Sequence, residues 1–557
     1  MSSKPWLKAY DPDVPTSLVY PSISLTDLLT HSAQCFPDQK CTIFRDQTIT
    51  YQEMENLTAR LAAGLCAIGV QKGERVGLLL PNIPQFVLAF YGILKSGGVV
   101  VAMNPQYKVR ELEYQIRDSG LSVLIALASQ RELVEDLRQR VSLRSVIYTH
   151  VEDAFDLVDS LHAEPRAGEG CLVAGNDCWL TTLLTQAKRF EPPQVALNPE
   201  DEAIFQYSGG TTGTPKAAVG LHRNLVANTF QFRHWLVGML DGKEVVLAAI
   251  PLFHVYGMVI AMSVGIGLGA SLVLVQNPRN VEDILDQIQR YHATLFPGVP
   301  TLYQAINNHP AVTSGKVDLS SIKACISGSA PLLLETKQRF EALTGGKLME
   351  GYGLSEAPTA THCNPMYGEN RSGSIGLPLP DVDCKIVDLE DTKTEMLPRQ
   401  IGELVIRGPQ VMKGYHNRPE EDRITVVDGW LYTGDIAWMD QDGYFYLVDR
   451  KKELIKIGGF QVWPREIEEV ISLHPKVKEV AASGVPDPIR VEIIKVWVVP
   501  IPGETLTGDD IRIWCGQQLA RYKVPSLVEF LDALPRTSVG KVLRRELKQQ
   551  YIDQQLL

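Results

Sequence analysis

Residues 206–216, Gln-Tyr-Ser-Gly-Gly-Thr-Thr-Gly-Thr-Pro-Lys, form the segment of this chain that is best suited to bind an anion. Its glycines let backbone N–H groups approach an anion closely, its hydroxyls add donors, and Lys216 adds positive charge. The segment follows the strand-like run EAIF and precedes the helical run HRNLVANTF. It is not a Walker A loop, because no Gly-Lys-Ser/Thr follows at the required spacing. Its composition leaves two readings open, a phosphate-binding loop of another kind and a Gly/Thr-rich surface turn.

Five further short motifs follow this segment along the chain. They are Ser-Gly-Ser-Ala-Pro at 327–331, Glu-Gly-Tyr-Gly-Leu-Ser-Glu-Ala at 350–357, Tyr-Thr-Gly-Asp at 432–435, Asp-Arg at 449–450 with Leu-Ile-Lys-Ile-Gly-Gly-Phe at 454–460, and Pro-Arg-Thr-Ser-Val-Gly-Lys at 535–541. With the first loop, they resemble in type and order the signatures of the adenylate-forming superfamily of acyl/aryl-CoA synthetases and luciferases. The likeness extends from about residue 25 to residue 548.

This resemblance implies an enzyme that activates a carboxylic acid with ATP, forms an acyl-adenylate, and passes the acyl group to coenzyme A. Both steps develop extra negative charge, so the protein's main task is positioning and electrostatic stabilisation. The resemblance also gives the candidate ATP- or AMP-binding residues: Ser208, Gly209, Gly210, Thr211, Thr212, Gly213, Lys216, Gly328, Ser329, Ala330, Gly351, Tyr352, Gly353, Ser355, Asp435 and Arg450.

The resemblance also implies individual roles at the nucleotide. Asp435 would accept hydrogen bonds from two adjacent ribose hydroxyls, and Arg450 would reinforce the ribose network or the carboxylate network. Tyr352 would stack on adenine. Ser355 stands where the family commonly has Thr, and it keeps the hydroxyl expected near the α-phosphate. Taken alone, Asp435 is equally a turn residue after Gly434.

Three candidate catalytic residues carry charge or a titratable ring: Lys541, His254 and Glu356. Lys541 would bridge the acyl carboxylate and the α-phosphate. Glu356, with Thr211, would hold Mg²⁺, which prefers a carboxylate together with phosphate oxygens. His254 would lie near the reacting carboxylate. The alternatives are a solvated lysine, a glutamate that starts a helix, and a structural histidine.

The junction near residue 450 is the candidate hinge, with Lys452 as the swivel. Rotation about Lys452 would carry Lys541 away and bring residues 457–461 over the thiol channel. We expect Lys456, Gly458 and Gly459 at coenzyme A, although a glycine pair is also typical of a β-bulge.

The candidate acyl pocket begins at Tyr256, Gly257 and Met258, and it offers no anion for an amino-acid substrate. Residues 258–270 are apolar and rich in small side chains, which suits an alkyl chain but also a core helix. The amino-acid sequences of these motifs are most similar to those of bacterial long-chain fatty-acid–CoA ligases. An aryl-acid ligase of the coumarate type is the first alternative, and a ligase that loads a carrier protein is the second.

These sites need a scaffold, and the first two-thirds of the chain alternate strand-like and helical runs. RVGLLL at 75–80 precedes a helical run and then VVVAMN, and SVLIAL, SVIYTH, EVVLAAI and SLVLVQ continue the series. This alternation predicts an α/β fold whose parallel sheets are covered by helices. Short strands after about residue 375 predict a small β-rich subdomain. We therefore expect a large adenylate-forming domain at 1–449 and a small mobile α+β domain at 450–557.

Composition restricts the class of partner and the compartment. The net charge is -11, with 54 Lys plus Arg against 65 Asp plus Glu, which argues against nucleic acid. The nine cysteines are scattered and lack a C-x-x-C pair, so neither a disulfide framework nor a zinc site is expected. The N-terminus has no signal-peptide core.

Residues 245–275 lack Asp, Glu, Lys and Arg, and that length is sufficient to span a bilayer. Pro251, His254 and a glycine-rich stretch instead predict a strand, a loop, a helix and a second buried strand. We expect a cytoplasmic enzyme with small-molecule substrates. The sequence leaves open whether it contacts a membrane peripherally or forms a homodimer.

Overall fold

The computed structural model describes residues 4–164, 176–208, 215–457, 460–487, 491–537 and 540–555. In this part of the chain the strands form four sheets. The largest has nine strands in the order β16 (Leu377–Pro378), β15 (Ala357–Cys363), β14 (Lys347–Leu354), β13 (Ala324–Ser327), β12 (Leu295–Gly298), β10 (Val245–Ala248), β11 (Ser271–Leu274), β1 (Lys40–Phe44) and β2 (Gln47–Thr50). Neighbouring strands from β14 to β1 are parallel, and the strands at both edges are antiparallel.

The second sheet has eight strands in the order β19 (Gly414–Tyr415), β9 (Lys216–Leu221), β8 (Glu202–Ser208), β4 (Val99–Ala102), β3 (Arg75–Leu79), β5 (Val123–Leu127), β6 (Ser145–Thr149) and β7 (Cys178–Trp179). It is parallel from β8 to β7. The strands predicted at residues 75–80 and 245–275 are therefore confirmed. Between β10 and β11 the chain forms a π-helix, η5 (Gly257–Ser263), and a short helix, α9 (Val264–Gly267).

Alternation along these strands explains why helices cover both faces of each sheet. In β4, Val100 and Ala102 pack into one core, whereas Val99 and Val101 pack into another. The core between the two large sheets contains α1 (Thr26–Cys35), α2 (Tyr51–Ala67), α3 (Pro84–Lys95), α6 (Leu157–His162), α7 (Leu180–Gln186), α8 (His222–Trp235), η5 and α9. The outer faces are covered by α4 (Val109–Ser119) and α5 (Arg131–Arg138) on the eight-stranded sheet, and by α10 (Val281–Tyr291), α11 (Pro300–Asn307), α12 (Pro310–Thr313) and α13 (Leu334–Thr344) on the nine-stranded sheet. The central parallel strands, such as β4 and β11, are buried on both sides, as parallel sheets require, whereas the edge strands β2 and β7 are partly exposed.

The third sheet is antiparallel and forms the small β-rich subdomain. Its strands are β17 (Asp383–Val387), β18 (Gly402–Arg407), β21 (Trp430–Met439), β20 (Val426–Val427) and β22 (Phe445–Arg450), with α14 (Pro419–Thr425) between β19 and β20. The short 3₁₀ helix η6 (Lys451–Glu453) follows β22 directly. We propose that the boundary between the two domains lies at this junction.

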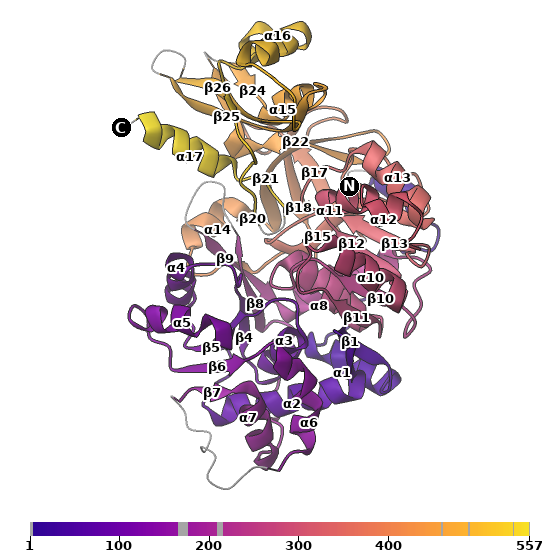
Figure 1. The fold of residues 1–557 in the computed structure, drawn as a ribbon, viewed down its shortest axis with the longest axis vertical. Helices are drawn as coiled ribbons and strands as arrows, with labels where there is room; N and C mark the ends of the chain where they lie inside the picture. The colour runs from indigo at the N-terminus through magenta and orange to yellow at the C-terminus, as the bar shows by residue number, and fades with distance from the viewer. Residues whose placement is uncertain are drawn as a thin grey trace.

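The last sheet and three helices form the C-terminal domain, which lies above the large sheets in Figure 1. Its strands are β24 (Phe460–Val462), β23 (Ile455–Ile457), β26 (Val491–Pro500), β25 (Val477–Asp487) and β27 (Leu527–Phe530), and its helices are α15 (Pro464–Ser472), α16 (Gly508–Gln518) and α17 (Arg544–Gln555). In the part of the chain that the structure describes, the buried residues of this domain form cores of their own. The predicted α/β class, with parallel sheets, a β-rich subdomain and a small α+β domain, is confirmed.

Candidate active site

The carboxyl ends of parallel strands in the nine-stranded sheet bring three predicted segments to one edge. His254 follows β10, residues 328–330 follow β13, and residues 351–355 lie in and after the end of β14. This edge is where α/β sheets usually bind their ligands.

Glycines at this edge are required by close packing. A Cβ added at Gly353 would lie 1.7 Å from the backbone oxygen of Thr359, where the pairing of β14 with β15 is irregular. One added at Gly328 would lie 3.2 Å from the ring of Tyr256, and one at Gly351 would lie 3.2 Å from the side chain of Ile326. The next residue after Gly328, Ser329, has a positive φ of 72°. The backbone therefore turns sharply just where an adenine ring is expected, and a Cβ is excluded at Gly353.

Asp435 is held from two sides in the antiparallel pair β21–β22. The hydroxyl of Tyr352 donates to Oδ2 of Asp435 at 2.5 Å, and Nε of Arg450 lies 2.9 Å from Oδ1. Asp435 is the register partner of Arg450, which explains their contact. The charge of Asp435 raises the pKa of Arg450, so the guanidinium stays protonated. Three predicted nucleotide-binding residues thus form one connected group.

The phosphate-loop residues from Gly209 to Thr214, including Gly210, Thr211, Thr212 and Gly213, lie outside the described residues. The loop joins β8 to β9, and Ser208 is the register partner of Lys216. The strand β9 therefore comes between the loop and α8, which the sequence analysis did not predict. The run AAVGL was too short and too apolar to be separated from the following helix.

Lys216 and Glu356 both contact Tyr415. Nζ of Lys216 lies 5.3 Å from the ring centroid of Tyr415, and the hydroxyl of Tyr415 donates to Oε1 of Glu356 at 2.8 Å. Lys216 also forms an ion pair with Glu421 of α14. Removal from water lowers the pKa of Lys216, and the charge of Lys452 adds to this effect. The loop lysine, the candidate Mg²⁺ ligand and the hinge lysine therefore share one electrostatic environment.

Tyr415 is a site residue that the sequence analysis missed. It lies in β19, which pairs with β9 directly after the phosphate loop. This long-range pairing, together with a hydrogen bond from the backbone N–H of Met412 to the backbone oxygen of Glu356 at 2.9 Å, brings it to Glu356, and its residue type alone gives no signal. Glu356 itself lies in the turn between β14 and β15, so neither of its neighbours in the sequence is helical.

His254 is neutral near pH 7. Its Nδ1 accepts a hydrogen bond from the backbone N–H of Tyr256 at 3.2 Å, which assigns the ring proton to Nε2. Burial lowers the pKa of His254 to about 4, and the charge of Lys541 contributes to that lowering. A neutral ring can donate its Nε2–H to a carboxylate without a change of charge.

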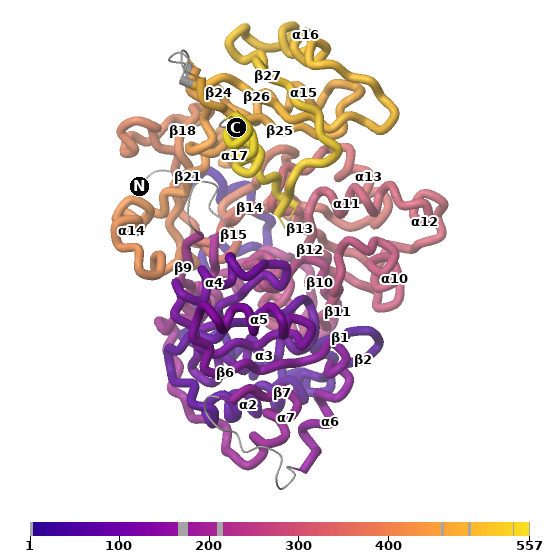
Figure 2. The backbone as a smooth tube through the Cα atoms, turned by 60° about the vertical axis from the view of Figure 1, so that its left-hand side comes forward, coloured from indigo at the N-terminus to yellow at the C-terminus, as the bar shows by residue number. Residues whose placement is uncertain are grey.

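Lys541 reaches the same edge of the sheet from the C-terminal domain. In Figure 2 a yellow segment descends from this domain towards β13 and α11. A Cβ added at Gly540 would lie 3.7 Å from Oγ1 of Thr301, at the start of α11. Burial lowers the pKa of Lys541 to about 8, Arg450 adds to the lowering, and Asp435 opposes it. The structure thus brings Lys541, His254, Asp435 and Arg450 together.

The candidate acyl-pocket residues are closely packed. Tyr256 donates its hydroxyl to the backbone oxygens of Gly298 and Ile326, at 3.1 and 2.6 Å. A Cβ added at Gly257 would lie 2.2 Å from the backbone oxygen of Pro251, and Met258 is fully buried. Their role as acyl contacts stays a prediction.

The hinge and coenzyme A candidates lie at the junction of the domains. Lys452 is exposed in η6, and Lys456 is exposed in β23. The backbone N–H of Lys456 donates to Oε2 of Glu492 at 3.0 Å. Gly458 and Gly459 lie outside the described residues.

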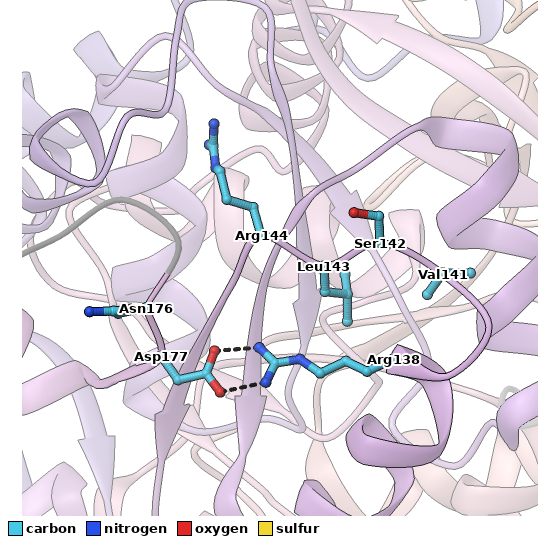
Figure 3. Close-up of a pocket in the computed structure, with 7 residues that line it drawn as sticks. All are labelled: Arg138, Val141, Ser142, Leu143, Arg144, Asn176 and Asp177. Atoms are coloured by element: carbon cyan, nitrogen blue, oxygen red, sulfur yellow. Dashed lines mark hydrogen bonds and ion pairs between the residues drawn. The ribbon is translucent and has the colours of Figure 1, made fainter.

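A surface pocket of about 460 Å³ lies elsewhere, and Figure 3 shows its lining. Its two arginines are both paired: Arg138 with Asp177, and Arg144 with Glu74 at 2.8 Å. None of its lining residues belongs to a predicted site segment.

Three further observations concern the described residues as a whole. The eight cysteines among them are all unpaired. No helix among them is long and apolar enough to cross a membrane. No group of three or more His, Cys, Asp or Glu side chains that could hold a metal ion was found in those ranges either.

Comparison with known protein families gives two matches. Residues 29–416 match the family described as AMP-binding enzyme, and residues 466–541 match the AMP-binding enzyme C-terminal domain.

Three relatives illustrate the similarity. The chain is 41% identical over 551 residues to a long-chain-fatty-acid–CoA ligase of Bacillus subtilis, and 38% identical over 553 residues to one of Escherichia coli O157:H7, with 98% of each chain covered. It is 34% identical to 4-coumarate–CoA ligase 2 of Nicotiana tabacum over 531 residues, with 92% of each chain covered.

Solved structures of CoA ligases also resemble this chain. The structure resembles ATP-bound MatB from Rhodopseudomonas palustris with a TM-score of 0.82 and 28% identity, over 95% of this chain and 99% of that one. The apo form of MatB gives a TM-score of 0.70 with the same identity and coverage. The overall arrangement is therefore closer to that of the ATP-bound relative.

Proposed function

The chain belongs to the family of AMP-binding enzymes, and we propose that it is an AMP-forming ligase that joins a fatty acid to coenzyme A. The observation that carries this proposal is the convergence of Lys541, His254 and the Asp435–Arg450 pair at one sheet edge. The full-length similarity of this chain to long-chain-fatty-acid–CoA ligases supports a fatty acid as the substrate.

The reaction has two steps. A carboxylate oxygen of the acid attacks the α-phosphorus of ATP, the bond to the bridging oxygen of the β-phosphate breaks, and pyrophosphate leaves. The thiolate sulfur of coenzyme A then attacks the acyl carbonyl, and AMP leaves with the carboxylate oxygen. Neither step needs a covalent enzyme intermediate, so positioning and electrostatics carry the catalysis.

Each candidate site residue would have a separate role in this reaction. Asp435 would bind the ribose hydroxyls, with its carboxylate already oriented by Tyr352 and Arg450. The neutral His254 would donate its Nε2–H to the acid, and Lys541 would stabilise charge that develops between the acid and the α-phosphate. The phosphate loop and Lys216 would hold the β- and γ-phosphates. Mg²⁺, when bound by Glu356 and Thr211, would neutralise phosphate charge.

The hinge residues would serve the second step. We propose that rotation about Lys452 removes Lys541 and brings Lys456, Gly458 and Gly459 to coenzyme A. A cytoplasmic location also stays a prediction, as do membrane contact and a homodimer.

One experiment tests the proposal and its alternatives. The purified protein is incubated with ATP, Mg²⁺ and either coenzyme A or an acyl-carrier protein, and with acids from C6 to C18 or coumarate. We expect a coenzyme A thioester of a fatty acid, together with AMP and pyrophosphate. Coumaroyl-CoA as the main product would favour the aryl-acid ligase, which the similarity to 4-coumarate–CoA ligase 2 makes the second candidate. Transfer to the carrier protein alone would refute both.

A further inference from the structure

The predicted swivel Lys452 lies between two residues that are each fixed by an ion pair. Lys451 pairs with Glu403, and Glu453 pairs with Arg544, while Lys452 between them is exposed. All three consecutive residues belong to η6. The two partners come from different bodies, because Glu403 lies in β18 of the large domain and Arg544 begins α17 of the small one.

On the large-domain side, Glu403 joins the hinge to the ribose-binding turn. Its side chain is only 5% exposed, and Oε2 accepts a hydrogen bond from Nζ of Lys451 at 2.7 Å. Its other oxygen, Oε1, accepts from the backbone N–H of Gly434 at 3.1 Å, next to Asp435. A buried carboxylate needs a counter-ion, and Lys451 supplies it. The residue before the swivel is therefore fixed to the same turn that presents Asp435.

On the C-terminal side, Arg544 joins the hinge to the segment that carries Lys541. Three residues after Lys541, it pairs with Glu453 and also with Glu468 of α15, where Nε and Nη2 lie 2.8 and 2.5 Å from the two carboxylate oxygens. Oε1 of Glu468 also accepts from the backbone N–H of Ala482 in β25, at 2.8 Å. A two-pronged pair of this kind fixes orientation as well as distance. The residue after the swivel is therefore fixed to the body of the small domain.

We propose that Glu403 and Arg544 are positioning residues that hold the two ends of the hinge, so that rotation of the C-terminal domain is confined to Lys452. This inference rests on the proposed two-step function. With both flanks fixed, turning the backbone of one residue carries Lys541 along a single defined path. If either flanking residue lost its ion pair, Lys541 would reach the active site in a displaced position. A displacement of about 1 Å can cost on the order of 100-fold in rate.

The first variant, Arg544→Met, loosens the C-terminal flank. We expect kcat for acyl-AMP formation to fall on the order of 100-fold while the KM for ATP changes little. Thioester formation from supplied acyl-AMP should fall much less, because Arg544 also fixes the segment of Lys541 to Glu468, and that segment does not serve the thioester step. Glu453→Gln should likewise slow acyl-AMP formation much more than thioester formation. The double variant should form acyl-AMP no more slowly than the slower single variant. Arg544→Lys, which keeps one charge, should recover part of the activity.

The second variant, Glu403→Gln, loosens the large-domain flank. The amide still accepts from Gly434 but no longer pairs with the charge of Lys451. We expect both half-reactions to fall, because the fixed end of the hinge serves both positions of the small domain. The matched control is Arg512→Met, which breaks an exposed pair with Asp509 on α16 and should leave both half-reactions unchanged.

Hydrogen exchange of the substrate-free protein gives a readout independent of activity. Arg544→Met should speed exchange at residues 451–457 and 540–547 and leave residues 430–439 unchanged. An equal loss of both half-reactions in Arg544→Met, or faster exchange across the whole C-terminal domain, would overturn the inference, because a merely structural arginine predicts that result. If the wild-type protein forms no acyl-AMP from any acid, the proposed function fails. The exchange pattern then still decides whether the hinge is held at both ends.

Discussion

The hydroxyl of Tyr352 donates a hydrogen bond of 2.5 Å to Asp435, a residue 83 positions away in the chain. Arg450 occupies the other oxygen of the same carboxylate, so each oxygen has one protein partner. An ionised carboxylate accepts about four hydrogen bonds, which leaves capacity for two ribose hydroxyls. We therefore propose that Tyr352 has a second role besides the predicted stacking, which is to orient Asp435, the proposed ribose ligand.

Tyr352→Phe separates these two roles, because it keeps the ring and removes the hydroxyl. A hydrogen bond to a charged group contributes about 1.5–3 kcal/mol, so we expect the KM for ATP to rise on the order of tenfold or more. Steady-state kinetics at saturating acid measures this. Tyr291→Phe is the matched control, because its hydroxyl donates to Asp46 at 2.5 Å on an exposed surface. An unchanged KM in Tyr352→Phe would refute the orienting role.

His254 should act as a neutral donor over the usual pH range. Since burial lowers its pKa to about 4, the ring is uncharged above that pH, and kcat/KM for acyl-AMP formation should show no histidine inflection between about pH 5 and 7. His254→Ala should lower the rate on the order of tenfold or more, because a hydrogen bond to the carboxylate is lost. A wild-type inflection near pH 6.5 that disappears in His254→Ala would show that the protonated ring acts instead.

Glu356→Gln should raise the Mg²⁺ concentration needed for acyl-AMP formation. The amide keeps the shape and still accepts from Tyr415, but it lacks the negative charge that Mg²⁺ prefers. Titration of Mg²⁺ in a pyrophosphate-release assay measures the change, and we expect a shift of tenfold or more, about 1.4 kcal/mol. Glu420→Gln, an exposed charge on α14, serves as the control. Equal Mg²⁺ requirements in wild type and Glu356→Gln would remove Glu356 as a ligand.

The sequence predicted those parts of the fold and site that depend on local pattern. Strands such as β3 and β10 are buried on both faces, so they appear as continuous apolar runs that need no partner to be recognised. Asp435 and Arg450 were predicted as one network, and the register of β21 with β22 gives them their contact.

Contacts that arise from distant pairing could not be predicted. Tyr415 meets Glu356 only because β19 pairs with β9, and Glu403 meets Lys451 only because β18 lies beside β21. Gly257 was predicted to line the acyl pocket, yet its missing Cβ also makes room for the backbone oxygen of Pro251, a contact that its own neighbours do not indicate. Sheet register decides such contacts, and register is not visible in residue type.

We expect Lys541 to give acyl-AMP formation a basic pH limit. Burial lowers the pKa of Lys541 to about 8, so the amine is protonated below that pH and loses its charge as the pH rises through it. Because the positive charge is the form that stabilises the developing phosphate charge, kcat/KM for acyl-AMP formation should be highest below about pH 8 and should fall above it.

The half-reactions and two variants test this limit. Thioester formation from supplied acyl-AMP should not show the basic fall, since under the proposed rotation Lys541 leaves the site before that step. Lys541→Ala should abolish acyl-AMP formation, with a loss of roughly 3 kcal/mol or more, and should spare the thioester step. Lys541→Arg keeps its charge at every accessible pH, so its residual acyl-AMP formation should have no fall near pH 8. A basic limit that persists in Lys541→Arg would assign the titration to another group, and equal losses of both half-reactions in Lys541→Ala would contradict the departure of Lys541 between the steps.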